Sequence, residues 1–217
     1  MRLLTYWLQR LVRKLVPAIA YRDPPRSGLT PDRLYAWLDT VWQRRCLDGT
    51  ILEVGCDECG TSYLTLQFLR RSGCPKPYVC GDTFSGFVHD QFEHEARMGL
   101  DRRYRLTFAN STLSFVRNLL AKYGADEINL VQGDIVTLDK DLLPGRIAAC
   151  LLDVDLEIPI YEGLKKVFPR LLPGAAILVD DCEEDSVWGA RKGYTRFLQE
   201  TGLPQKTFMG MGLIEKP

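Results

Sequence analysis

The sequence predicts an α/β domain with a doubly wound, mainly parallel sheet, preceded by an N-terminal helical extension. Short apolar runs alternate along the chain with longer segments of helical periodicity. The apolar runs lack polar alternation, which is typical of strands that are covered on both faces in a parallel sheet. With 217 residues, 46% of them hydrophobic, the chain suits one compact domain with a sizeable core.

Residues 1–48 are expected to form the helical extension and a linker. Leucines recur at helical spacing in residues 1–20, while basic side chains interrupt any apolar run that could span a bilayer or act as a signal peptide. Residues 1–26 carry six basic side chains against one acidic one. Three roles stay open for this segment: a helix packed on the domain or on a partner subunit of a homodimer, a peripheral membrane contact, or a mobile cover over the active site.

The remaining elements follow in order, and the main domain covers residues 49–217. A Pro- and Gly-rich linker at 21–33 leads into a helix near Pro31–Arg45, with Thr30 as N-cap and Pro31 at the first helical position. Strands are predicted at 51–55, 77–82, 128–134, 148–155 and 175–181, and helices at 63–71, 113–123, 160–171 and 190–200. The last residues predict a final strand pair of uncertain direction.

The composition excludes several classes of protein. The 28 basic and 28 acidic side chains give a net charge of zero, and no basic stripe with interleaved aromatics runs through the domain, so nucleic acid is not an expected partner. Seven cysteines without a preceding secretory leader favour free thiols and a cytoplasmic location. Cys56 and Cys59 form a C-x-x-C, but no second pair or nearby histidine completes a zinc site.

The loop after the first strand predicts a cofactor site. Its glycines, Gly55 and Gly60, allow close backbone approach to a ligand and a tight turn into the next helix. The acidic pair Asp57-Glu58 would repel a pyrophosphate, and the third glycine of the dinucleotide fingerprint is missing, which disfavours a nicotinamide-dependent oxidoreductase. S-adenosylmethionine, with its positive sulfonium and ammonium groups, tolerates such acids. An ordinary strand-to-helix turn is the structural alternative.

Two further acids follow the next strands. Asp82, with Thr83, ends the second strand about twenty residues beyond Gly60, where a carboxylate can accept hydrogen bonds from both ribose hydroxyls of a cofactor. Asp134 follows the third strand at a position that would border the adenine ring, although a solvated turn is the alternative.

Paired acids end the fourth and fifth strands and predict a metal. Asp153 and Asp155 follow one strand and Asp180 and Asp181 the next, so they emerge at the same sheet edge. Without a cation these anions would repel one another, whereas Mg²⁺ takes oxygen ligands. We expect Asp153, Asp180 and Asp181 to bind Mg²⁺, with Mn²⁺ or Ca²⁺ as alternatives. The metal would lower the pKa of a substrate hydroxyl and orient it towards the methyl donor.

Two questions about this site stay open. Asp155 and Asp181 can instead cap helices, or form ion pairs with Lys165 and Arg191. A general base is offered by His89 and His94, which lie in the polar insertion after the second strand. Either ring could take the hydroxyl proton, and the alternative is that both are surface histidines without a role.

From about residue 49 to 201 the chain resembles the macrocin O-methyltransferase (TylF/MycF-like) family of metal-dependent sugar O-methyltransferases. The matching segments are Glu53-Val-Gly with Gly60, Asp82–Phe87, Val116–Gly124, Gly133 with Thr137-Leu138, Asp153–Leu156, Pro169–Gly174, Asp180-Asp181 and Trp188–Lys192. The resemblance implies a Rossmann-like, class I S-adenosylmethionine methyltransferase.

The resemblance also implies site residues. Glu53, Gly55, Asp82 and Asp134 would line the cofactor pocket, and the three strand-end acids would bind Mg²⁺. We add neighbouring positions to the expected cofactor contacts, namely Gly60, Ser62, Thr83 and Asp153, and we count Asp153 with the two histidines as catalytic candidates.

The chain departs from the family on the substrate side. Where the family usually has a Tyr and a Ser or Thr after the strand-four acids, this chain has Glu157, Ile158 and Pro159; the double glycine before strand five becomes Gly174-Ala175. Related catechol-type enzymes carry a lysine where this chain has Leu156, so that branch fits poorly. We expect an O-methyltransferase of a sugar hydroxyl on a glycosylated natural product, an oligosaccharide or a polysaccharide precursor. A non-catalytic cofactor-binding scaffold or regulatory protein and a methyltransferase of a non-sugar hydroxyl are the alternatives.

Overall fold

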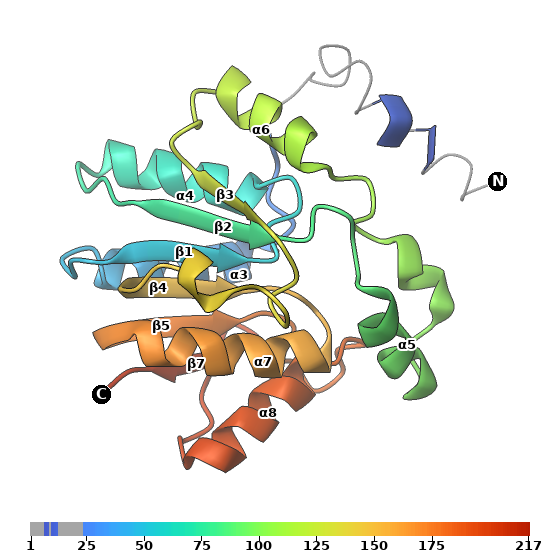
Figure 1. Ribbon diagram of the computed structural model, residues 1–217. Helices are drawn as coiled ribbons and strands as arrows, with labels where there is room; N and C mark the ends of the chain where they lie inside the picture. Colours follow the sequence, from blue (N-terminus) through green and yellow to red (C-terminus); the bar gives the residue numbers. More distant parts are fainter. Residues whose placement is uncertain (1–6, 9, 13–23) are drawn as a thin grey trace.

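The computed structural model describes residues 7–8, 10–12 and 24–217 (Figure 1). Residues 7–8 and 10–12 are helical, and their apolar side chains, among them Trp7 and Leu8, are exposed. The roles considered for residues 1–26 fall largely outside the described residues and stay predictions. No helix among the described residues is long and apolar enough to cross a membrane.

The described strands form one seven-stranded sheet in the order β3-β2-β1-β4-β5-β7-β6. Their bounds are β1 Thr50–Val54, β2 Tyr78–Asp82, β3 Asn129–Gln132, β4 Ile147–Leu152, β5 Leu171–Val179, β6 Thr207–Phe208 and β7 Met211–Glu215. The first five strands are parallel, which confirms the prediction of a doubly wound, mainly parallel sheet. The final pair, whose direction the sequence left open, is antiparallel and extends the sheet beyond β5.

Helices cover both faces of the sheet (Figure 1). One face packs against α3 (Pro31–Gln43), α4 (Gly60–Arg71) and α6 (Leu113–Lys122), and the other against α7 (Glu157–Val167) and α8 (Ala190–Thr201). The short helix α5 (His89–Arg97) lies beyond the carboxyl ends of the strands (Figure 1). Three 3-10 turns complete the described helices: η1 Arg102–Leu106, η2 Lys140–Leu142 and η3 Phe168–Arg170.

The central strand β4 shows why polar alternation is absent. Its side chains are all buried: Ala149 and Leu151 belong to the core on the α3 and α4 side, whereas Cys150 and Leu152 belong to the core on the α7 and α8 side. Because successive residues of a strand point to opposite faces, a strand covered on both faces must be apolar throughout.

Both bounds of helix α7 differ from those predicted, for local reasons. Helix α7 begins at Glu157 rather than at 160, since Pro159 falls in its first turn, where a missing N–H costs nothing. It ends at Val167 rather than at 171, because Pro169 has no backbone N–H to continue the helical hydrogen bonds, and the chain tightens into η3.

Helix α3 is part of the core, although the sequence placed it in the extension. Ala36, Trp37 and Val41 are fully buried in the same apolar cluster as β1 and α4. The indole N–H of Trp37 donates a hydrogen bond of 2.9 Å to the hydroxyl of Thr65 in α4, so its polar atom is satisfied inside the core.

We predict that Trp37→Ala lowers the free energy of unfolding by about 3–5 kcal/mol, because it leaves a large cavity and removes the hydrogen bond from the indole to Thr65. Urea denaturation measures the loss. Gln43→Ala, an exposed position of the same helix, is the control and should change stability by less than about 0.5 kcal/mol. Equal stabilities for the two variants would show that α3 is an appendage rather than a layer of the domain.

Candidate active site

A cleft with about 930 Å³ of empty space opens at the carboxyl ends of the parallel strands. It is lined by residues that follow each strand: 53–58 and 60–61 after β1, 81–83, 86–88 and 91 after β2, 133–135 after β3, and 153–156 and 159 after β4. Arg26, Gly28 and Phe108 complete the lining. This is the edge where open parallel sheets bind their ligands. Most of the predicted cofactor residues lie in this lining: Glu53, Gly55, Gly60, Asp82, Thr83, Asp134 and Asp153.

Two glycines of the loop after β1 lie where a side chain would not fit. Gly55 has a φ of 85°, and a Cβ there would lie 1.7 Å from the carbonyl oxygen of Asp153. A Cβ on Gly60 would lie 1.8 Å from the carbonyl oxygen of Arg26. The first contact brings the loop onto the end of β4, and the second packs the segment before α3 against the start of α4.

Glu53 is almost fully buried, with 2% of its surface exposed. Its Oε2 accepts hydrogen bonds from Ser62, at 2.6 Å, and from the hydroxyl of Tyr78, at 2.9 Å. Burial raises the pKa of Glu53 well above its usual value. Ser62 itself is fully buried, bonds to Glu53 and is not among the residues that line the cleft, so its direct contact with a cofactor stays a prediction. The sequence indicated the loop but not which side of α4 faces it.

Asp82 fastens the loop to β2. Its Oδ2 accepts hydrogen bonds from the backbone N–H groups of Cys56 and Asp57, at 2.9 and 3.0 Å, and its Oδ1 accepts one from Phe84, at 2.7 Å. Burial raises the pKa of Asp82, and these amide donors oppose the rise. A carboxylate has about four acceptor sites, so these donors leave room for about one further hydrogen bond. Binding of both ribose hydroxyls by Asp82 therefore stays a prediction, and the carboxylate has few free acceptor sites for it.

The remaining predicted cofactor residues are held by neighbours. The Thr83 hydroxyl donates to the carbonyl of Gly86, at 2.7 Å, and closes the turn after β2. Asp134 accepts hydrogen bonds from the side chain of Gln91, at 2.8 Å, and from the backbone N–H of Val136, at 3.0 Å. Thr83 and Asp134 both line the cleft, and each already forms hydrogen bonds within the protein.

Carboxylates gather at the ends of β4 and β5. One oxygen from each of Asp153, Asp155 and Asp181 lies within 4.8 Å of the others. Burial, followed by repulsion from the neighbouring acids, raises the pKa of Asp153 and of Asp155 well above the usual value. Asp155 and Asp181 have φ values of 60° and 54°, a left-handed conformation that aspartate tolerates better than most residues and that clusters at functional sites.

Asp180, the third acid that the sequence assigned to the metal, faces an arginine. Arg33 of α3 lies 3.0 Å from Asp180 and 2.9 Å from Asp181, and it also pairs with Glu183. Burial raises the pKa of Asp180 to about 6, and repulsion from Asp181 adds to the rise, while Arg33 opposes it. Within the described ranges no basic side chain pairs with Asp153 or Asp155. Arg33 therefore neutralises part of the charge of Asp180 and Asp181. Asp153 and Asp155, which line the cleft, have no such cationic partner among the described residues.

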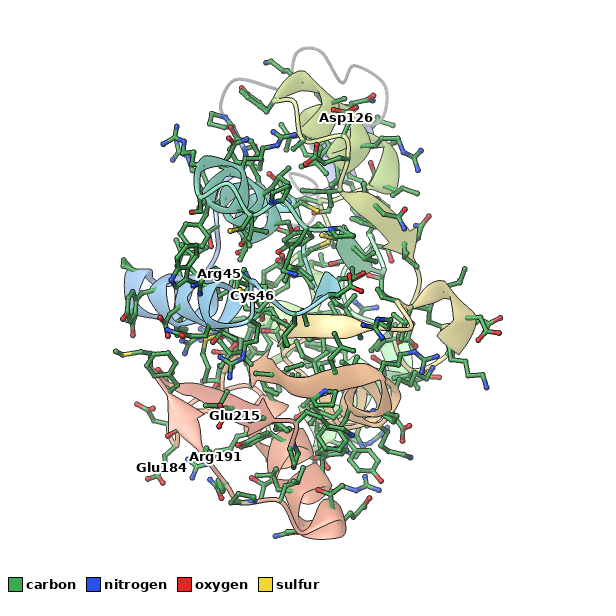
Figure 2. The ribbon with its side chains drawn as sticks, turned by 90° about the vertical axis from the view of Figure 1, so that its left-hand side faces the viewer. Arg45, Cys46, Asp126, Glu184, Arg191 and Glu215 are labelled. Carbon is green, nitrogen blue, oxygen red and sulfur yellow. The ribbon has the colours of Figure 1, made fainter. Side chains whose placement is uncertain are left out.

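The ion pairs that the sequence offered as an alternative do not form in the described chain. Figure 2 shows Arg191 and Glu184 side by side, and Arg191 lies 2.9 Å from that glutamate. Lys165 lies 3.3 Å from Glu162 in its own helix. Neither cation neutralises the strand-end acids.

The described lining of the cleft includes neither histidine. His89 is exposed at the start of α5, and Nε2 of His94 lies 3.9 Å from Glu157. The helix that carries them is anchored elsewhere: buried Glu95 accepts a hydrogen bond of 2.7 Å from the backbone N–H of Glu157 at the start of α7. The geometry thus gives the proposed histidine base no support. Of the three catalytic candidates, Asp153 lies in the cleft.

An aromatic wall, which sequence reasoning missed, borders the cleft beyond β2. Phe87 and Phe108 line the cleft, with ring centroids 5.7 Å apart. Trp188 packs 5.6 Å from Phe87 and 5.3 Å from Tyr104. These residues are spread over three loops, so no local spacing in the sequence marks them as one group.

We predict that Gly55→Ala destabilises the protein by at least about 3 kcal/mol and removes binding of S-adenosylhomocysteine, because the methyl group would force the loop and β4 apart. Denaturation and calorimetry measure the two effects. Gly145→Ala, an exposed position with no heavy atom within 4 Å of the added Cβ, is the control and should bind normally. Normal binding by Gly55→Ala would mean that the close approach is dispensable.

Comparison with known proteins places this geometry in a family. No family model matches the chain. Over 196 residues, which cover 85% of this chain and 71% of the relative, it is 30% identical to the 8-demethyl-8-(2,3-dimethoxy-alpha-L-rhamnosyl)-tetracenomycin-C 4'-O-methyltransferase of Streptomyces olivaceus.

Among solved structures, the O-methyltransferase NovP matches 97% of this chain and 98% of its own, with a TM-score of 0.76 and 16% identity. The calicheamicin methyltransferase CalS11 matches 84% of this chain and 78% of its own, with a TM-score of 0.64 and 20% identity. These likenesses show the Rossmann-like fold of class I methyltransferases. Together with the curated relative they show that the chain is an S-adenosylmethionine-dependent O-methyltransferase and belongs to the macrocin O-methyltransferase (TylF/MycF-like) family.

Proposed function

We propose that this enzyme methylates a hydroxyl of a sugar and that Asp153, Asp155 and Asp181 hold a divalent cation for the reaction. The observation that carries the proposal is the position of the acids: Asp153 and Asp155 line the same cleft as the cofactor loop. Metal-assisted methyl transfer needs this juxtaposition, because the acceptor hydroxyl must meet both the cation and the methyl donor.

The residues present fit a hard divalent cation. The three carboxylate oxygens lie within 4.8 Å of one another, near enough for small side-chain rotations to bring them around one octahedral Mg²⁺, whose opposite ligands lie about 4.2 Å apart. Asp180 Oδ1 is buried without a well-directed hydrogen bond, although Arg33 lies 3.0 Å away. All the donors are carboxylates, which favours Mg²⁺ or Mn²⁺ over softer ions. Bound there, the cation would act as a Lewis acid and make the acceptor hydroxyl easier to deprotonate.

The chain's own residues would bind and orient the reactants. The loop from Gly55 to Gly60, fixed by Asp82, positions S-adenosylmethionine, which supplies the methyl group. Phe87 and Phe108 offer an apolar wall that excludes water and can contact the apolar face of a sugar ring. Asp153 stands between the two halves of the cleft and is the catalytic candidate that we retain.

The sugar acceptor is supported by the names of the similar proteins. The curated relative is named for methylating a rhamnosyl group, and CalS11 is also described as a TDP-rhamnose 3'-O-methyltransferase. The segment in which this chain departs from the family opens α7, and Pro159 within it lines the cleft. We therefore expect the sugar acceptor of this enzyme to differ from the acceptors of the relatives.

We predict that the enzyme methylates a deoxysugar when it is tested on a panel of nucleotide-linked and glycoside-linked acceptors. Mass spectrometry detects the methylated product. EDTA should lower the rate at least about a hundredfold, and added Mg²⁺ should restore it. Turnover that resists EDTA would disprove the metal mechanism. Methylation of phenols but of no sugar would move the acceptor to the non-sugar alternative, and cofactor binding without any product would favour a scaffold.

A second prediction separates the two possible ligand sets. Asp155→Asn should raise the Kd for Mn²⁺ about 10–100-fold, measured by electron paramagnetic resonance. Asp180→Asn should raise it less, because Arg33 already pairs with that side chain. Asp185→Asn, at an exposed acid near the same edge, is the control. If Asp180→Asn weakens binding more than Asp155→Asn, the cation uses the set that the strand ends predicted from sequence.

A further inference from the structure

Three cysteines with no part in the proposed reaction converge behind the cofactor loop. The sulfur atoms of Cys56, Cys59 and Cys80 lie within 4.8 Å of one another, and all three side chains are buried. Cys56 and Cys59 belong to the loop after β1, and Cys80 belongs to the adjacent strand β2. The sequence shows the C-x-x-C, and the sheet register adds the third thiol.

We propose that Cys56 and Cys59 are a redox-active pair that closes to a reversible disulfide in the wall of the cofactor cleft. The proposal concerns the thiols alone, so it stands or falls independently of the acceptor and of the metal.

The backbone of the loop already has the shape that a disulfide needs. The N–H of Cys59 donates a hydrogen bond of 2.6 Å to the carbonyl of Cys56, which closes a four-residue turn. The Cα atoms at the ends of such a turn lie less than about 7 Å apart, within the range that a disulfide bridges. The two sulfurs can therefore approach by side-chain rotation, without a break in the strands.

The surroundings make Cys59 the nucleophile. It is the N-cap residue of α4, where the positive end of the helix favours a thiolate. Although burial opposes ionisation, hydrogen bonds from the thiols of Cys56 and Cys80 lower the pKa of Cys59 to about 6. Burial and the neighbouring thiols raise the pKa of Cys56. The lowered pKa of Cys59 beside the raised pKa of Cys56 favours Cys59 as the attacking sulfur in disulfide formation.

The backbone gives an independent reason to assign Cys59 a role. Its φ is 60°, in the left-handed region that glycine adopts freely and that costs other residues energy. A cysteine held in such a conformation at a ligand loop calls for an explanation in function rather than in packing.

The nearby charges favour a disulfide over a thiolate-bound metal. Glu53 and Asp82 both disfavour ionisation of Cys59. Three thiolates beside these buried acids would concentrate negative charge in a site shielded from water, whereas a disulfide is neutral.

The oxidant can be hydrogen peroxide, which is small enough to enter by the cleft that Cys56 lines; the sulfur of Cys59 is buried behind it, within 4.8 Å of the sulfur of Cys56. The Cys59 thiolate attacks one peroxide oxygen, the O–O bond breaks, and a sulfenic acid and hydroxide form. The sulfur of Cys56 then attacks that of Cys59, the S–O bond breaks, and water leaves with the Cys56 proton. The hydroxide takes up the proton that Cys59 had released. In sum, two thiols lose two electrons and two protons, and one peroxide becomes two waters.

The test uses the full chain, reduced, freed of reductant and treated with hydrogen peroxide before alkylation and peptide mapping. We expect a linked Cys56–Cys59 peptide that dithiothreitol reverses. Peroxide should remove the free thiols of both residues at least about tenfold faster than that of Cys150, an equally buried thiol in β4 with no neighbouring cysteine in the described cluster, because Cys59 attacks the peroxide and Cys56 then closes the disulfide. Cys46→Ser in all samples removes the exposed thiol that Figure 2 shows beside Arg45.

Two variants serve as controls. Cys59→Gly keeps the left-handed backbone, so it should fold and leave Cys56 free, whereas Cys80→Ser should still form the link. Three outcomes would overturn the proposal. The first is that Cys56 and Cys59 stay as free as Cys150 after peroxide treatment, and the second is a disulfide from either cysteine to Cys80 in place of the Cys56–Cys59 disulfide. The third is a metal ion that the purified protein binds in a one-to-one ratio and loses when Cys80 is replaced.

Discussion

The contact between Gly55 and the carbonyl oxygen of Asp153 joins the two halves of the site. β1 and β4 are neighbours in register, with Val54 opposite Leu152, so both strands end at the same level of the sheet. Because Gly55 has no side chain, the loop can turn directly over the end of β4. The loop proposed to bind the cofactor and the carboxylates proposed to face the acceptor therefore border one cleft, and a side chain at this position would separate them.

That arrangement brings many carboxylates to one edge, and each is stabilised differently. Glu53 accepts hydrogen bonds from two hydroxyls, Asp82 accepts them from three backbone amides, and Asp180 pairs with a guanidinium from α3. Asp153 and Asp155 face the cleft with raised pKa values and no ion pair among the described residues. Since buried charges are costly unless they are paired, the acids without a partner mark the part of the edge where the proposed cation would bind.

The sequence was a good guide wherever a strand's own pattern fixed the position of a residue. Apolar runs predicted the parallel sheet, and topology then required Asp153 and Asp181 to meet at one edge, as they do. Features that depend on distant segments gave no such signal. Arg33 lies 147 residues before Asp180, and nothing near it in the chain indicates an acidic partner. Ser62 shows a different limit: the glycine loop indicates where a helix starts, but not that the first turn buries Ser62 against Glu53.

Helix α3 links the core to the charge balance of the site. Arg33 lies four residues before Trp37, so both side chains project from the same side of the helix. Burial of the indole fixes the helix, and the helix in turn holds the guanidinium against Asp180 and Asp181. A cation that binds Asp181 must share this carboxylate with Arg33, whereas Asp153 and Asp155 are free of that competition. The strength of cation binding would therefore depend on a helix outside the α/β repeat, and the cation would be drawn towards the two acids that face the acceptor.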